Sequence, residues 1–285
     1  MDKSGKIAIL FGDTRFMHLA DRLKTDFRVE VYGVLGLENT KPTPFECVKN
    51  CEFLILPLPA CKPLSTMINC AENVDLKDIF SVLDKNVTVL SGKANENLNI
   101  LARQHGINLI DYYTNEFEIL NAVPSAEGAI KIALERTDFT LCGSSCLILG
   151  FGRIGKVLAK MLSGIGALVT VAARSPEALA TAKSLGFDTQ NIYDMSSCLN
   201  KADIIFNTVP SLILDQKNLL NVKKDALIID LASKPGGCDF ESAKSLKLNF
   251  IHALGLPGII APKTSSEIII NCICSFIEER RINGT

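Results

Sequence analysis

The chain has 285 residues, enough for one large domain or two ordinary ones, and 47% of them are hydrophobic, so we expect a sizeable buried core. Its formal net charge of -1 provides no basic field that would attract nucleic acid non-specifically. No apolar run approaches the roughly 20 residues of a membrane-spanning helix, and Met1–Lys6 leads almost directly into a strand-like run, without a signal peptide. We therefore expect a cytoplasmic protein that binds neither nucleic acid nor membranes.

Five short apolar stretches in the first part of the chain predict strands that alternate with helices. The stretches are residues 6–11, 28–34, 53–56, 86–91 and 107–111. Near-continuous apolar strands that alternate with helices are typical of a parallel sheet covered on both faces. We predict a first α/β domain over residues 1–122.

A helical pattern over residues 115–134 is interrupted by Pro124. Asn115 and Glu118, three positions apart, resemble a capping box, and a proline disfavours helix at the residue before it. We predict that one helix ends near Pro124. A new helix begins at Ser125 and serves as the connector into a second domain, residues 123–265.

A glycine loop dominates the second domain. The strand Ser145–Leu149 ends in Gly150-Phe151-Gly152-Arg153-Ile154-Gly155, and a helical pattern follows. This order of strand, G-x-G-x-x-G turn and helix favours a dinucleotide site over a chance match. Gly150 permits the tight turn, Gly152 lets the backbone approach a pyrophosphate, and Gly155 lets helix and strand pack closely. The start of the helix, at Arg153 and Ile154, offers N–H groups and a positive dipole end to the phosphates.

The end of the next strand bears on the choice between NAD and NADP. Residues 167–172 are apolar and lead into Ala173, Arg174 and Ser175, without the Asp or Glu that usually holds the ribose 2′-OH of NAD. A guanidinium can instead bind a 2′-phosphate through two hydrogen bonds. We therefore favour NADP over NAD. Ser175 is also a candidate N-cap with Pro176 at the first helical position, and both roles are compatible.

Three further strands are predicted at residues 203–207, 226–230 and 248–251, each followed by a polar or Gly/Pro-rich tail. In open parallel sheets, ligands bind beyond the carboxyl ends of the strands. We therefore expect the rim of the cofactor site to contain Asn207, Thr208, Val209, Pro210, Ala232, Ser233, Pro257 and Gly258.

A closing helix is predicted over Ser266–Arg281, within a last segment of residues 266–285 that packs towards the N-terminal domain. The ten cysteines are scattered, no pair shows C-x-x-C spacing, and the chain contains three histidines, so we expect reduced thiols and no metal. The predicted fold class is α/β, with two Rossmann-like parallel-sheet domains joined by a long connector helix.

Several stretches together resemble the family of the dipicolinate synthase A subunit, the nucleotide-binding subunit found in spore-forming bacteria. The resemblance runs end to end, and the single departure is Ile259, where a basic residue is expected. The stretches that carry it are Gly12-Asp13-Thr14-Arg15, Leu56-Pro57-Leu58-Pro59, Ser91-Gly92-Lys93, Asn121 to Ala129, Gly150 to Gly155, Leu256-Pro257-Gly258 and Ala261-Pro262-Lys263-Thr264.

This resemblance implies the oxidation of dihydrodipicolinate, or of a hydroxylated precursor from the lysine pathway, to pyridine-2,6-dicarboxylate. NADP is the implied acceptor. The implied partner is the flavoprotein-like B subunit of dipicolinate synthase, and any flavin belongs to that partner. The resemblance also implies sporulation, the mother-cell cytoplasm, and a homodimer or hetero-oligomer.

A dicarboxylate substrate calls for cationic and hydroxyl donors near the strand ends. The substrate-binding candidates are Thr14, Arg15, Asn121, Ser125 and Lys263, and the catalytic candidates are Lys93, Glu127 and His252. Five of these candidates have a plainer alternative. Arg15 can pair with Asp13 at the surface, Ser125 can be an N-cap, Glu127 can be a favourable charge in a first helical turn, and His252 and Lys263 can be structural or solvated.

Two other functions remain open at this point. One is a 2-hydroxyacid or amino-acid dehydrogenase, which has a similar pair of domains but usually a clear His–carboxylate pair. The other is a nucleotide-binding scaffold whose partner carries out the redox chemistry. A likeness of fold does not separate these functions.

Overall fold

The computed structural model describes residues 5–283, and it divides the chain into two compact units. The N-terminal unit runs up to Glu118 and includes the chain from Ala261 onward, whereas the C-terminal unit comprises Ile119–Ile260. The predicted boundaries, after residues 122 and 265, lie a few residues away from these divisions. No helix among the described residues is long and apolar enough to cross a membrane.

The N-terminal unit is built on a five-stranded parallel sheet with the order β2-β1-β3-β4-β5. Its strands are β1 (Lys6–Gly12), β2 (Arg28–Val34), β3 (Phe53–Ile55), β4 (Thr88–Ser91) and β5 (Asn108–Asp111). Its helices are α1 (Thr14–Leu23), α2 (Pro44–Val48), α3 (Leu76–Ser81), α4 (Glu96–His105) and α12 (Pro262–Asn283).

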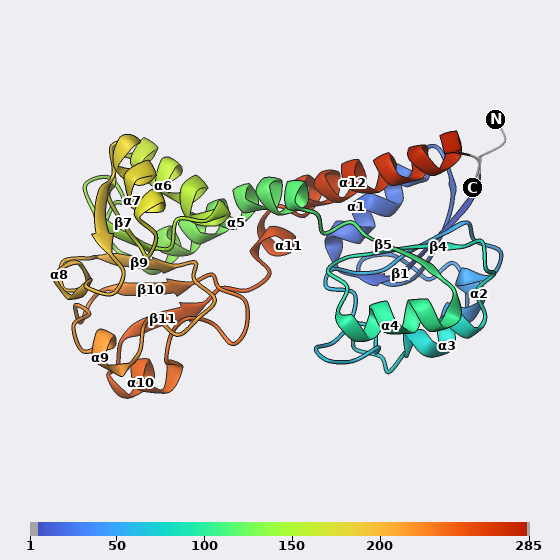
Figure 1. Cartoon of the computed structure of the whole chain (residues 1–285), viewed down its shortest axis with the longest axis horizontal. Helices are drawn as coiled ribbons and strands as arrows, with labels where there is room; N and C mark the ends of the chain where they lie inside the picture. Colours follow the sequence, from blue (N-terminus) through green and yellow to red (C-terminus); the bar gives the residue numbers. More distant parts are fainter. Residues whose placement is uncertain (1–4, 284–285) are drawn as a thin grey trace. The chain divides into compact units, whose positions relative to one another are not determined.

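Alternating side chains of β1 cover the two faces of this sheet, as the period of a strand requires. Ile7 and Ile9 pack in a cluster with α1 and α12, and Ala8 and Leu10 pack on the other face with α2, α3 and α4. Figure 1 shows α1 and α12 on one side of the sheet and α3 and α4 on the other. The sheet is therefore buried on both faces, which explains its continuous apolar strands.

The closing helix α12 contributes to the core of the N-terminal unit. Ile269 and Ile273 are fully buried and belong to the same cluster as Phe16 and Leu19 of α1. The chain thus completes its first unit with residues from its last helix.

The C-terminal unit is built on a six-stranded parallel sheet with the order β11-β10-β9-β6-β7-β8. Its strands are β6 (Ser145–Leu149), β7 (Leu168–Ala173), β8 (Asp188–Asn191), β9 (Ile204–Asn207), β10 (Leu227–Asp230) and β11 (Asn249–His252). Its helices are α6 (Arg153–Ile165), α7 (Pro176–Ser184), α8 (Ser196–Leu199), α9 (Gln216–Leu219), α10 (Phe240–Ser245) and α11 (Leu256–Ile260), and α5 (Asn115–Arg136) enters this unit from the preceding one.

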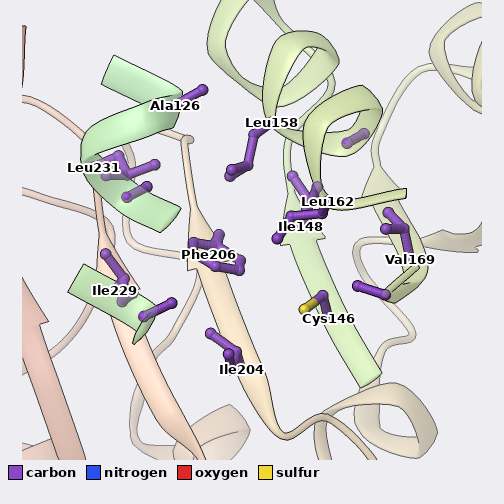
Figure 2. Close-up of a cluster of buried hydrophobic side chains, with 14 of the residues drawn as sticks. Ala126, Cys146, Ile148, Leu158, Leu162, Val169, Ile204, Phe206, Ile229 and Leu231 are labelled. Atoms are coloured by element: carbon purple, nitrogen blue, oxygen red, sulfur yellow. The ribbon is translucent and has the colours of Figure 1, made fainter. Parts of the chain in front are cut away.

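The core of this unit lies on both sides of the central strand β6. Cys146 and Ile148 pack against Leu158 and Leu162 of α6 and against Phe206 of β9, as Figure 2 shows. Leu147 and Leu149 point to the opposite face and pack in a second cluster that includes residues near α8, α9 and α10. The central strand is thereby fixed, and its carboxyl end presents the glycine loop.

The predicted break at Pro124 is wrong, because α5 runs without interruption through that residue. The helix starts after Thr114, whose hydroxyl accepts the N–H of Phe117 at 3.2 Å, so Asn115 is not the cap. Ser125 lies inside the helix and donates its hydroxyl to the carbonyl of Asn121 at 2.8 Å. A continuous buried face, formed by Ala126, Ala129 and Ala133, favours one long helix despite the lost proline N–H.

Candidate nucleotide-binding site

A pocket of about 500 Å³ lies at the carboxyl ends of β6, β7, β8 and β9 in the C-terminal unit. This edge is where ligands bind in open parallel sheets. The residues that line the pocket are Gly150, Phe151, Gly152, Ala173, Arg174, Ser175, Ala178, Ile192, Tyr193, Thr208, Val209, Pro210, Ser211 and Ile213.

The glycines of the loop have different structural roles. Gly150 has a left-handed backbone with φ of +94°, and a Cβ there would stand 2.6 Å from Oγ1 of Thr208. A Cβ on Gly155 would run into the carbonyl oxygen of Gly150, so this glycine lets α6 approach β6 closely. A Cβ on Gly152 would meet no atom within 4 Å, which leaves open space in front of α6.

The N-terminus of α6 is suited to a phosphate. Gly152 is the N-cap residue and provides no side-chain hydrogen bond, and the first turn contains no acidic residue. The first N–H groups of a helix have no intrahelical partners, and the helix dipole favours an anion there. The residues present therefore fit a dinucleotide whose pyrophosphate lies at this helix end, where Arg153 and Ile154 are the first helical residues.

The end of β7 combines an exposed cation with a helix cap. Arg174 lines the pocket and is exposed. Ser175 accepts the N–H of Ala178 at 3.1 Å, so the predicted N-cap role is confirmed. The Ser175 hydroxyl also donates to Oε2 of Glu177 at 2.7 Å, and this bond holds the pKa of the Glu177 carboxyl below its ordinary value. Glu177 thus places a negative charge beside Ser175, which lines the pocket.

A buried network shapes the loop that follows β9. Asn207 is fully buried and donates to Oδ1 of Asp230 at 2.8 Å and to the carbonyl of Val209 at 3.1 Å. Asp230 in turn accepts the N–H groups of Ala232 and Gly237. Asn207 does not line the pocket itself, but it fixes the backbone that brings Thr208, Val209 and Pro210 into the pocket wall.

His252, a predicted catalytic residue, and several predicted cofactor residues lie outside the pocket wall. Nε2 of His252 lies 2.9 Å from the carbonyl oxygen of Ala232, and its ring centroid is 4.9 Å from that of Phe240. These contacts account for His252 as a packing residue of the C-terminal unit. The predicted cofactor residues that do not line the pocket are Arg153, Ile154, Gly155, Asn207, Ala232, Ser233, Pro257 and Gly258.

In the N-terminal unit, Arg15 is buried and its guanidinium is paired with the Asp13 carboxylate. It is 7% exposed, and its Nε and Nη2 atoms contact the Asp13 carboxylate at 2.7 to 3.0 Å. Nη2 also donates to the carbonyl of Leu58 at 3.1 Å. The pairing with Asp13 that the sequence left open is therefore present, although it is buried rather than at the surface. Thr14, the first residue of α1, lies between the two.

A second pocket, of about 360 Å³, lies at the ends of β1, β2 and β3 in the N-terminal unit. Asp13, Phe16 and Leu58 line it, and Arg15 does not. In this sheet the strand order reverses between β1 and β3, a position at which ligands bind in doubly wound sheets. The N-terminal unit therefore has its own concave edge beside Asp13.

The candidates on α5 and α12 occupy ordinary helical positions. Asn121 and Ser125 lie inside α5, and Oδ1 of Asn121 is a buried atom without a hydrogen-bond partner among the described residues. Glu127 is exposed in the middle of α5, so its placement in a first helical turn is wrong for the same reason as the break at Pro124. Lys263 is exposed in the first turn of α12.

The parallel sheet, the glycine loop and the pocket beside it form a dinucleotide-binding domain, and the family model that matches this domain identifies an oxidoreductase with a nicotinamide cofactor. Residues 126–234 match the family model of the D-isomer specific 2-hydroxyacid dehydrogenase NAD binding domain. Residues 6–113 match the family model of the N-terminal domain of the dipicolinate synthase A subunit.

The whole chain identifies the particular family. It is 32% identical to the dipicolinate synthase A subunit of Bacillus subtilis (strain 168), over 96% of both chains. The chain therefore belongs to the dipicolinate synthase A-subunit family.

Solved structures agree with this assignment. The dipicolinate synthase A subunit from Bacillus halodurans superimposes with a TM-score of 0.84 at 27% identity, covering 97% of this chain and 98% of that one. The same protein from Bacillus subtilis superimposes with a TM-score of 0.83 at 29% identity, covering 99% of both chains. D-lactate dehydrogenase from Escherichia coli shares the fold, with a TM-score of 0.63 at 14% identity and 97% coverage of both chains.

Proposed function

We propose that this chain is the nucleotide-binding subunit of a dipicolinate synthase that acts in the mother-cell cytoplasm during sporulation. It oxidises dihydrodipicolinate, or its hydroxylated precursor, to pyridine-2,6-dicarboxylate and passes a hydride to NADP. The flavoprotein-like B subunit is its partner, and any flavin is bound there. The observation that carries the proposal is membership of the family over 96% of the chain, combined with a dehydrogenase-type pocket.

NADP is the preferred cofactor in this proposal. The residue at the end of β7 is Arg174, and it lines the pocket at the strand end where dehydrogenases of this fold hold the ribose. No Asp or Glu occupies residues 173–175, where the acidic partner of an NAD ribose is usual. Arg174 supplies a positive charge for the 2′-phosphate of NADP. Glu177 weakens the preference for NADP, because it accepts the hydrogen bond of the Ser175 hydroxyl that would otherwise be available to the phosphate.

The proposed reaction requires the protein to orient the substrate against the nicotinamide more than to activate either of them. The bound nicotinamide supplies the hydride acceptor, and aromatisation of the substrate ring supplies the driving force. The chain's own residues bind the dinucleotide at the N-terminus of α6 and place the substrate carboxylates. The candidates for binding the substrate remain Thr14, Arg15, Asn121, Ser125 and Lys263. The catalytic candidates remain Lys93, Glu127 and His252, with Glu127 as the base.

The test follows the absorbance of the reduced nicotinamide. The purified chain is mixed with freshly made dihydrodipicolinate and either NADP or NAD, with and without the flavoprotein-like subunit. NADP reduction by the chain alone supports a self-sufficient dehydrogenase. Activity that appears on addition of the partner assigns the chain as one half of the enzyme, whereas NADP bound without turnover in any mixture supports the scaffold function instead.

A further inference from the structure

The backbone of Lys93 has an unusual conformation. Lys93 follows β4 and has a φ of +56°, in the left-handed region that glycine adopts at no steric cost. Side chains other than Gly, Asn and Asp are rare in this region, and they persist when surrounding contacts determine the conformation. A lysine here is therefore strained, and surrounding contacts must hold its backbone in place.

Asp111 determines this conformation. Its carboxylate accepts the backbone N–H of Lys93 at 2.9 Å, that of Ala94 at 2.7 Å and that of Tyr113 at 2.9 Å. The preceding residue, Gly92, is held as well, because its carbonyl accepts the N–H of Ala60 at 2.7 Å. The turn that carries Lys93 is thus fixed on both sides.

A contact with Tyr113 also positions the side chain of Lys93. Its Nζ lies 5.3 Å from the centroid of the Tyr113 ring, a cation–π geometry, and the residue is exposed. Arg15, the other cation predicted at a strand end of this sheet, is buried and bound to Asp13. Lys93 meets a neutral aromatic face instead, so its charge is available to an anion.

We propose that Lys93 binds one carboxylate of the dicarboxylate substrate and that Asp111 is a positioning residue that acts through Lys93. The inference rests on the proposed function, because that function supplies the substrate. Asp111 and Tyr113 hold the ammonium at the carboxyl edge of the N-terminal sheet before the ligand arrives. This pre-organisation reduces the entropy lost on binding.

The first experiment compares two pyridine acids by calorimetry on the full chain with NADP present. The probes are pyridine-2,6-dicarboxylate and pyridine-2-carboxylate, which differ by one carboxylate. The unmodified chain binds the dicarboxylate more tightly. Lys93→Gly weakens dicarboxylate binding about tenfold, as expected for one lost charge-assisted contact, and leaves the monocarboxylate nearly unchanged. Lys93→Arg restores part of the difference.

A matched control separates strain from binding. Lys247 is also an exposed lysine with a left-handed backbone, at a φ of +55°, but it lies in the turn after α10. Replacing either lysine with glycine relieves strain, so Lys93→Gly and Lys247→Gly both raise the Tm by about 2 °C. Lys247→Gly leaves the affinity for both acids unchanged.

The role of Asp111 is tested by a double-mutant cycle. Asp111→Asn lowers the Tm in either background because backbone hydrogen bonds are lost. It weakens dicarboxylate binding in the unmodified chain, but not in the Lys93→Gly chain, where no lysine is left to position. Equal loss of affinity in both backgrounds assigns Asp111 a purely structural role and overturns this part of the proposal.

The outcomes distinguish this inference from the proposed function. If the unmodified chain binds the dicarboxylate and Lys93→Gly binds it equally well, Lys93 is not the carboxylate ligand although the proposed function stands. If the unmodified chain does not discriminate between the two acids, the dicarboxylate specificity of the proposed function fails as well.

Discussion

The two units share one local arrangement, a buried strand followed by a turn with glycine and a helix, yet the N-termini of the two helices differ. In the N-terminal unit, Asp13 caps α1 by accepting the N–H of Arg15 at 3.0 Å, and the Arg15 side chain folds back on the same carboxylate. In the C-terminal unit, Gly152 leaves the N-terminus of α6 without a side-chain cap and with open space before it. The residue at the N-cap, rather than the presence of glycine, decides which helix end can receive a phosphate.

The largest effect is expected when the second helix end is given the cap of the first. Gly152 has an extended backbone, and a Cβ there meets no atom within 4 Å, so Gly152→Asp should fold normally. Its carboxylate occupies the helix N-terminus and repels the pyrophosphate. We expect the Kd for NADP to rise about 100-fold, on the order of 2.7 kcal/mol, as measured by calorimetry.

Gly152→Asn is the matched control, because it has the same shape without the charge. A smaller loss of affinity than in Gly152→Asp is expected, and an equal loss would assign the effect to bulk rather than to charge. Thermal unfolding of both variants should match that of the unmodified chain.

Gly155 tests the packing side of the same loop. A Cβ at this position collides with the carbonyl of Gly150, so Gly155→Ala should destabilise the C-terminal unit by about 2 kcal/mol. Gly164 lies in the same helix, and a Cβ there meets no atom within 4 Å, so Gly164→Ala should instead stabilise by up to about 1 kcal/mol. Urea unfolding measures both changes, and similar values for the two variants would contradict the packing role.

Arg174 tests which dinucleotide the open helix end receives. Arg174→Ala removes the charge proposed for the 2′-phosphate, so the Kd for NADP should rise about tenfold while that for NAD changes little. Glu177→Gln should shift the preference towards NADP, because it removes the negative charge that the Ser175 hydroxyl contacts. Equal effects of Arg174→Ala on the two dinucleotides would exclude its role in discrimination.

The smallest expected effect is on the stability of the N-terminal unit and concerns the buried carboxylate of Glu30. Burial opposes ionisation of Glu30, but Lys6 at 2.8 Å, with Lys41 and Arg28, outweighs it and lowers the pKa below the ordinary value. The stabilisation is therefore present above the unfolded pKa and is lost as the pH falls through the lower folded pKa. Glu30→Gln should cost about 1 kcal/mol at neutral pH and progressively less in acid, as measured by urea unfolding across pH.

The parts of the fold with strong local patterns could be predicted from sequence. The strands β1 and β6 are buried along almost their whole length and therefore have continuous apolar sequences, which made them predictable. The glycine loop was predictable because its glycines occur between a strand and a helix. The strand β8 has the sequence Asp-Thr-Gln-Asn and lies at the edge of its sheet, where no apolar pattern is required. Missing β8 also meant missing Ile192 and Tyr193, which follow it and line the pocket.

The errors have a common physical cause, which is that tertiary contacts override local preference. Pro124 disfavours a helix locally, but the buried alanines of α5 maintain one across it. Arg15 has the chemistry to bind a carboxylate of the substrate, but in the structure its buried guanidinium binds Asp13. Sequence spacing alone does not predict whether this side chain is buried. Likewise, no pattern in the sequence predicts the left-handed backbone of Lys93.

The contribution of α12 to the first unit affects the order in which the protein matures on the ribosome. Ile269 and Ile273 are part of the core around Phe16, so the N-terminal unit lacks a share of its buried surface until α12 has been synthesised. The C-terminal unit comprises Ile119–Ile260 and has all its residues earlier. The unit that is translated first therefore receives the last part of its core only after the second unit has been synthesised.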